Sequence, residues 1–119
     1  MINHFQDEKA VKLRSYEKTR ELGRILGLEG TLEILLLLDE RPRQYKEIDA
    51  EQILPQTTLN RRLKMLQTVG IIKKFPISSD RRETHQYTLT LKGIELMKFI
   101  KSYEKTLSIP PSQQKIEEY

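Results

Sequence analysis

The sequence contains no cysteine and no tryptophan, and it has only two histidines among its 119 residues. Without cysteine the chain cannot form disulfides, thiolate zinc sites, iron–sulfur clusters or a thiol nucleophile. No phosphate-binding loop or nucleophile elbow is present, so we expect no catalytic residue, no metal, no cofactor and no enzyme activity. The longest apolar run, residues 34–38, is far shorter than a membrane span, and the first ten residues lack the apolar core of a signal peptide. We therefore expect a cytoplasmic protein without membrane contacts.

The basic residues are concentrated in the middle third of the chain. The formal net charge is +4, and charged residues make up 32% of the composition. Residues 1–40 hold six basic and eight acidic side chains, residues 41–82 hold ten and four, and residues 83–119 hold five of each. A local excess of this kind indicates a surface that binds a polyanion, although a solvated face that happens to be basic is the alternative.

Hydrophobic periodicity predicts a mainly helical chain that carries one β-hairpin. Pro55 suits a first helical position, Thr90 an N-cap, and Gly70 a helix end. Pro76 indicates a bulge or an edge position in its strand. Residues 31–40 are apolar around most of the helix circumference, which is typical of a central buried helix. Helices are expected over residues 4–26, 31–40, 45–51, 55–68 and 91–107, and strands over 71–77 and 85–90.

The segment 55–68 has the clearest functional pattern. Leu59, Leu63 and Leu66 recur at helical spacing and predict a buried stripe, which leaves the opposite face polar. In a helix-turn-helix the second helix enters the major groove of DNA, where arginine pairs with guanine and asparagine with adenine. We therefore predict that Arg61 and Asn60 read bases.

Basic residues outside this helix extend the predicted surface. Arg81 and Arg82, at the hairpin tip, are expected to enter the minor groove. Lys73, Lys74 and Arg43 are expected to hold phosphates, which fix the register of the protein without reading sequence. The full predicted set of DNA-binding residues is Gln56, Thr57, Thr58, Asn60, Arg61, Lys64, Thr68, Lys73, Lys74, Arg81, Arg82 and Arg43.

Two segments resemble the winged helix-turn-helix of the MarR and HxlR families of prokaryotic transcriptional regulators. LPQTTLNRRLKMLQTVGIIKK is similar to a recognition helix that leads into the wing, and SSDRRETHQYTLTLKGIEL is similar to the wing and its exit into the last helix. The resemblance implies an α+β, mainly α fold, with recognition helix 55–68 in the major groove and wing 78–84 at the minor groove. It also implies a homodimer, joined by the N- and C-terminal helices, on a pseudo-palindromic duplex site. HxlR-like proteins commonly carry a sensing cysteine near the N-terminus, and its absence here excludes thiol redox sensing.

The same residues leave two alternative functions and two alternative residue roles open. An architectural DNA-binding protein of low sequence specificity and a winged-helix module that binds protein are the alternative functions. Arg62, at the border of the buried stripe, is as well suited to an acidic neighbour as to DNA, and the Arg81 loop could be an ordinary solvated turn. No effector ligand is indicated.

The expected domain organisation follows from the predicted elements and the resemblance. We expect an N-terminal dimerisation helix (1–28), a winged-helix DNA-binding domain (29–95), a C-terminal dimerisation helix (91–107) and a flexible tail (108–119).

Overall fold

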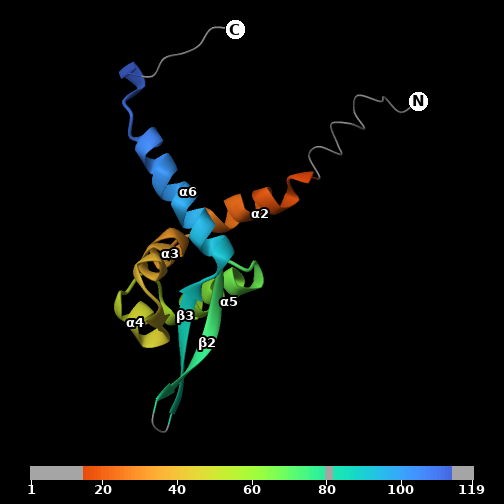
Figure 1. The fold of residues 1–119 in the computed structure, drawn as a ribbon, viewed down its shortest axis with the longest axis vertical. Helices are drawn as coiled ribbons and strands as arrows, with labels where there is room; N and C mark the ends of the chain where they lie inside the picture. The colour runs from red at the N-terminus through yellow and green to blue at the C-terminus, as the bar shows by residue number, and fades with distance from the viewer. Residues whose placement is uncertain (1–14, 80–81, 114–119) are drawn as a thin grey trace, which may run out of the picture. The chain divides into compact units, whose positions relative to one another are not determined.

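The computed structural model describes residues 15–79 and 82–113. They form an α+β, mainly α fold, as predicted (Figure 1). The chain divides into two compact units, residues 1–32 and 33–119, which are described separately below. The elements in chain order are α2 (Glu17–Leu26), α3 (Thr31–Glu40), β1 (Arg43–Gln44), α4 (Tyr45–Ala50), α5 (Gln56–Thr68), β2 (Ile72–Ser79), β3 (Arg82–Leu89), α6 (Leu91–Leu107) and the 3-10 turn η1 (Pro111–Gln113).

The first unit contains helix α2, which corresponds to the end of the helix predicted over residues 4–26. The earlier part of that prediction lies outside the described residues. Ile25 is buried, whereas most of the other α2 side chains are exposed, which matches the few apolar positions seen in its sequence. The helix ends at Gly27, whose backbone N–H donates to the Gly23 carbonyl at 3.1 Å.

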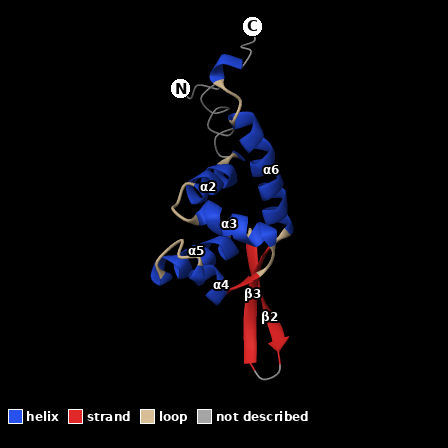
Figure 2. Cartoon of the chain, turned by 90° about the vertical axis from the view of Figure 1, so that its left-hand side faces the viewer, coloured by secondary structure: helices blue, strands red, loops and turns tan. Residues whose placement is uncertain are grey.

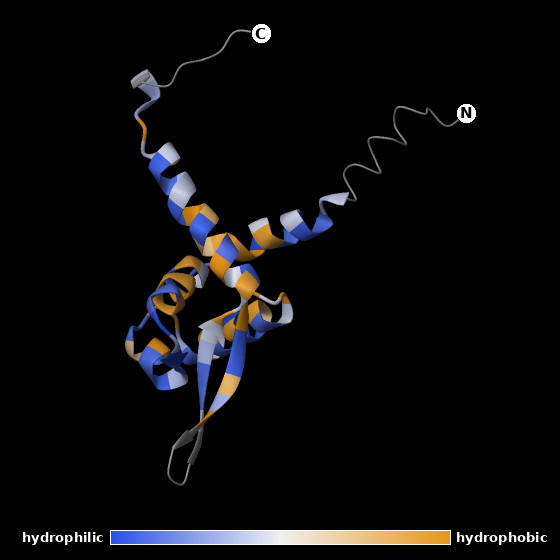
Figure 3. Cartoon of the chain, viewed as in Figure 1, coloured by the Kyte–Doolittle hydropathy of each residue, from blue (hydrophilic) through white to orange (hydrophobic). Residues whose placement is uncertain are grey.

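The core of the second unit lies between helices α3, α5 and α6 and the base of the hairpin. Figure 3 shows hydrophobic residues covering much of α3, as expected for the central buried helix. Full burial of one leucine or isoleucine side chain stabilises a fold by about 1.5–3 kcal/mol. The buried aliphatic side chains of this unit include Ile34, Leu35, Leu38, Ile48, Leu59, Leu63, Leu66, Ile72, Leu89 and Met97.

The sheet is antiparallel, with strand order β1-β3-β2. Strands β2 and β3 pair without interruption from Ile72↔Leu89 to Ser79↔Arg82, and the hairpin projects away from α3, α4 and α5 in two perpendicular views (Figures 1 and 2). Of the two predictions made from Pro76, the edge position is confirmed, because β2 is an edge strand and its register contains no bulge. The two-residue strand β1, which pairs with Tyr87 and Gln86, was not predicted.

The junction between the hairpin and α6 is closed by Thr90, which caps the helix as predicted. Its hydroxyl oxygen accepts the Gly93 backbone N–H at 3.2 Å, and its hydroxyl proton is directed at the Gly70 and Ile71 carbonyls. Gly70 has φ +80°, a conformation that favours glycine, and it ends α5 as expected. Gly93 is buried in the first turn of α6, directly against the backbone of Ile71.

Helix boundaries agree closely with the sequence predictions. Helices α3 and α6 have the predicted bounds, 31–40 and 91–107. Helix α5 begins one residue later than predicted, because Pro55 is the N-cap: its ψ of 150° is extended, and its carbonyl accepts the first helical bond from the Leu59 N–H at 2.8 Å. Within the described residues, none of the helices has the length and apolar character needed to cross a membrane.

Candidate nucleic-acid interface

Helix α5 has one buried and one exposed face. The predicted inner stripe of Leu59, Leu63 and Leu66 is buried, which fixes the orientation of the helix. Arg62 is also buried, with an exposed fraction of 8%, which favours a role inside the protein over contact with DNA. Thr58 is half-buried. The exposed side chains that cover the opposite face are Gln56, Thr57, Asn60, Arg61, Lys64 and Thr68.

This exposed face combines the hydrogen-bonding groups that distinguish base pairs. The Arg61 guanidinium offers a planar pair of donors, and the Asn60 amide offers one donor and one acceptor. Gln56 Nε2 donates to Asp49 Oδ2 at 3.1 Å, which fixes the amide and leaves its oxygen free to accept from a ligand. Thr68 Oγ1 donates to the Lys64 carbonyl at 2.9 Å, which engages its hydroxyl proton within the helix.

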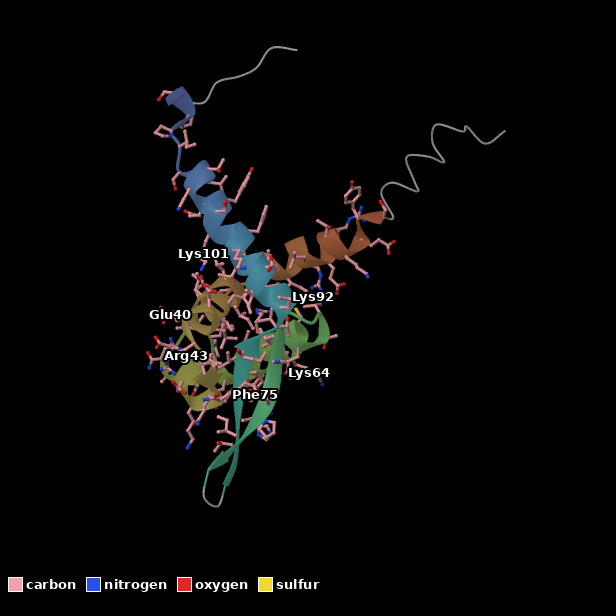
Figure 4. The ribbon with its side chains drawn as sticks, in the orientation of Figure 1. Glu40, Arg43, Lys64, Phe75, Lys92 and Lys101 are labelled. Carbon is pink, nitrogen blue, oxygen red and sulfur yellow. The ribbon has the colours of Figure 1, made fainter. Side chains whose placement is uncertain are left out.

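The two lysines predicted to hold phosphates lie on opposite faces of strand β2. Side chains alternate along a strand, and Lys74 pairs across the hairpin with Tyr87, whereas Lys73 pairs with Thr88. Lys74 Nζ lies 5.8 Å from the centre of the Tyr87 ring, within the range of a cation–π interaction. Figure 4 shows Phe75, the next residue of β2, and Lys64 on the neighbouring helix α5. Only Lys74 shares the Tyr87 face of the hairpin.

A cavity of about 510 Å³ opens between α4, α5 and the hairpin. Each of the described residues that line it carries a polar group, and none of them is acidic. The hairpin contributes Lys74, Thr84, His85 and Tyr87 to the lining, α5 contributes Gln56 and Asn60, and the start of α4 contributes Gln44 and Tyr45.

The two tyrosines of this cavity remain hydrogen-bond donors at neutral pH. Burial raises the pKa of Tyr45, and the Asp49 carboxylate and Tyr87 raise it further. Burial also raises the pKa of Tyr87. Both hydroxyl groups therefore keep their protons under physiological conditions.

Glu47 fixes the start of α4, and with it the cavity wall formed by Gln44 and Tyr45. One carboxylate oxygen accepts the Gln44 backbone N–H at 3.1 Å, and the other lies 2.8 Å from Arg41 Nη1. The hydrogen bond from Gln44 is the largest cause, and the Arg41 contact the second, of a Glu47 pKa below its ordinary value of 4.5. The charged carboxylate therefore stabilises the folded state.

The Glu47→Gln substitution is expected to lower the melting temperature at neutral pH. A carboxylate with a lowered folded-state pKa contributes stability above the unfolded-state pKa and loses it as the pH falls through the folded-state pKa. The difference between wild type and Glu47→Gln should therefore shrink as the pH falls below 4.5. Thermal unfolding by circular dichroism at several pH values measures this difference. Glu51→Gln, which removes an exposed charge at the end of the same helix, is the control. A difference that is the same at every pH would contradict the assignment.

Arg43 was predicted to hold a phosphate, and the structure gives it another role. Its side chain is 9% exposed, and Nη2 donates to Glu40 Oε2 at 2.6 Å (Figure 4). Its Nε donates to the Leu37 carbonyl at 3.4 Å. Arg43 thus satisfies backbone and carboxylate oxygens at the C-terminal end of α3, where a cation is favourable, and we remove it from the candidate interface.

The remaining predicted residues belong to the hairpin tip. Arg81 lies outside the described residues, and Arg82 is described as the first residue of β3. Tyr45, His85 and Tyr87 were not predicted as site residues, because their proximity depends on how α4 packs beside the hairpin. The available sequence signals were Tyr45 at the start of the short helix that precedes the predicted recognition helix, and His85 at the start of the second predicted strand.

Helices α3, α4 and α5 followed by the β2–β3 hairpin define a winged helix-turn-helix protein. The HxlR-like helix-turn-helix family matches residues 25–108, which is more than half of the chain. The chain belongs to this family. The expected likeness to HxlR-type regulators is thereby confirmed, and the family is one of regulators rather than enzymes.

Individual relatives and solved structures agree with the family. An uncharacterised HTH-type transcriptional regulator of Mycobacterium tuberculosis is 38% identical over 78 residues, which are 63% of this chain and 49% of that protein. The chain therefore spans about half the length of the curated relatives it matches. The reduced form of the transcriptional regulator YodB from B. subtilis has the same fold, with a TM-score of 0.70 and 23% identity over 83% of this chain and 97% of that one. A MarR-family structure from Porphyromonas gingivalis gives a TM-score of 0.59 and 24% identity, over 77% and 91% of the two chains.

Proposed function

We propose that this protein is a sequence-specific transcriptional regulator that binds double-stranded DNA in the cytoplasm. Helix α5 lies in the major groove in this proposal. The observation that supports it most strongly is the polar, exposed face of α5, which lies directly opposite a buried leucine stripe. Because the buried leucine stripe fixes the orientation of α5, the helix can hold Arg61 and Asn60 in register with base edges.

The β2–β3 hairpin is the proposed wing, with residues 78–84 at the minor groove. It projects from the same unit as α5 and carries the sequence Asp80-Arg81-Arg82 at its tip. Arginine is the side chain best suited to a narrow minor groove of strongly negative potential. The remaining exposed polar residues of α5 (Gln56, Thr57, Lys64 and Thr68) complete the proposed contact surface together with the half-buried Thr58 and with Lys74. Lys73, on the opposite face of β2, is left out of this surface.

The proposed assembly is a homodimer joined through the N- and C-terminal helices. Helix α6 exposes several large apolar side chains, and Tyr16, the N-cap residue of α2, is also exposed. Exposed apolar patches mark interaction surfaces in proteins. A two-fold dimer would present two copies of α5 to a pseudo-palindromic site.

The Arg61→Ala substitution tests base reading by α5. Loss of a bidentate contact is expected to cost about 1–3 kcal/mol at one base pair and to relax specificity there. Affinities for a preferred duplex, and for duplexes altered at each position in turn, are measured by mobility shift for wild type and Arg61→Ala. Lys98→Ala removes one exposed positive charge from α6 and serves as the control.

The expected result is a loss of discrimination at one position for Arg61→Ala alone. Equal discrimination by both variants at every position would contradict base reading by Arg61. A wild-type protein that binds all duplexes equally would favour the architectural function instead.

A further inference from the structure

The cavity between α4, α5 and the hairpin has the chemistry of an anion site. Lys74 supplies a positive charge, and Tyr45, Asn60 and His85 supply hydrogen-bonding groups. Two carboxylates of α4 lie next to lining residues and are both engaged: Asp49 Oδ2 accepts from Gln56 Nε2 at 3.1 Å, and Glu47 Oε1 accepts from the Gln44 backbone N–H at 3.1 Å. An anion entering this cavity therefore meets a cation and hydrogen-bond donors, and the described residues that line it include no carboxylate.

The position of the cavity indicates which anion it would take. In the proposed complex α5 occupies the major groove and the hairpin tip reaches the minor groove. The two grooves of a duplex are separated by one sugar-phosphate strand, so that strand has to pass between α5 and the hairpin. The cavity lies there, because Gln56 and Asn60 of α5 form one wall and Lys74 and His85 of the hairpin form another.

We propose that this cavity seats a phosphodiester of the DNA strand between the two grooves, with Lys74 as its cation and the Tyr45 hydroxyl as a donor. The proposal rests on the proposed function. Lys74 is suited to this role because its ammonium group is already held over the Tyr87 ring at 5.8 Å. Holding the group in place before binding reduces the conformational entropy lost when the phosphate binds.

Lys73 provides a test within the same strand. It is adjacent to Lys74 in sequence, is also exposed, and carries the same charge, but it lies on the opposite face of β2 and is not among the residues that line the cavity. General attraction between a basic protein and DNA would weaken by a similar amount when either lysine is neutralised. A seated phosphate would make the two substitutions unequal.

The experiment compares Lys74→Gln and Lys73→Gln by measuring duplex affinity as a function of salt concentration. Each lost phosphate contact lowers the slope of log affinity against log salt by about 0.9. Between about 50 and 200 mM salt, wild type should therefore lose about 3.5-fold more affinity than Lys74→Gln, while Lys73→Gln should behave like wild type. Lys74→Arg should retain the wild-type slope, and thermal unfolding of each variant confirms folding.

A neutral backbone linkage identifies the phosphate itself. Methylphosphonate is substituted at one position at a time along a fixed duplex, and each duplex is bound by wild type and by Lys74→Gln. At the seated position, the losses from the linkage and from Lys74→Gln should not add, because both remove the same contact. Tyr45→Phe should lower affinity for the unmodified duplex without changing the salt slope.

The outcomes separate this inference from the proposed function. Equal slopes for Lys74→Gln and Lys73→Gln, or additive losses at every linkage, would overturn the phosphate site while leaving DNA binding intact. A wild-type protein that binds no duplex would overturn both.

Discussion

Replacing Gly93 with alanine is expected to destabilise the protein by about 3 kcal/mol, the upper end of the usual cost of forcing extra atoms into a packed core. A Cβ at this position would lie 2.2 Å from the Ile71 carbonyl oxygen and 3.1 Å from Leu89 Cδ2. The first contact is with backbone, so a change of side-chain rotamer cannot relieve it. The same carbonyl accepts the Thr90 backbone N–H at 3.0 Å, and its displacement would disturb the junction that joins the hairpin to α6.

Gly23→Ala is the matched control, because Gly23 is also a helical glycine. A Cβ there would meet nothing within 4 Å. Alanine in a helix interior is favoured over glycine by roughly 0.5–1 kcal/mol, so this substitution should stabilise. Chemical denaturation of both variants gives the two free energies of unfolding. Gly93→Ala with wild-type stability would show that the close packing of α6 on Ile71 is wrong.

The Phe99→Glu and Leu107→Glu double substitution is expected to convert a dimer into a monomer. The two side chains are 63% and 64% exposed in the single chain, and Phe99 stacks on Tyr103, with ring centres 5.7 Å apart. Phe99, Tyr103 and Leu107 follow one another at intervals of four residues and therefore form one stripe along α6. An unpaired charge in such an interface costs several kcal/mol, which corresponds to a dissociation constant raised at least a hundredfold.

Light scattering at micromolar concentration measures this change directly. Wild type should scatter as twice the 14.1 kDa chain, and the double variant as one chain. Lys105→Glu changes the charge on the opposite side of α6 and should leave the dimer intact. A wild-type protein that scatters as a single chain would contradict the dimer proposal.

The elements that sequence predicted well are those specified by local patterns. Helix α3 is apolar around its circumference and is bounded by Gly30 and Pro42, and Thr90 supplies a cap for α6; both helices have their predicted bounds. The buried face of α5 followed from three leucines at helical spacing. In each case a single segment contains the signal.

The features that sequence did not predict depend on contacts between segments. Strand β1 has two residues and exists only because it pairs with β3. Arg43 looks like a surface cation in sequence, and its burial follows from the way the end of α3 meets β1. The cavity was missed for the same reason, since its walls come from α4, α5 and the hairpin. Lys73 and Lys74 were grouped together, although strand alternation separates them.

Selection of bound fragments from a random duplex pool tests the central claim, that paired copies of α5 read a DNA sequence. The wild-type protein is mixed with duplexes of randomised sequence, and the bound fraction is recovered, amplified and sequenced. We expect enrichment of one short sequence in two opposed copies, with centres about 10–10.5 base pairs, or a multiple of this, apart. A recovered pool as random as the starting pool would contradict sequence recognition by α5, and enrichment of single, unpaired copies would contradict the two-fold dimer.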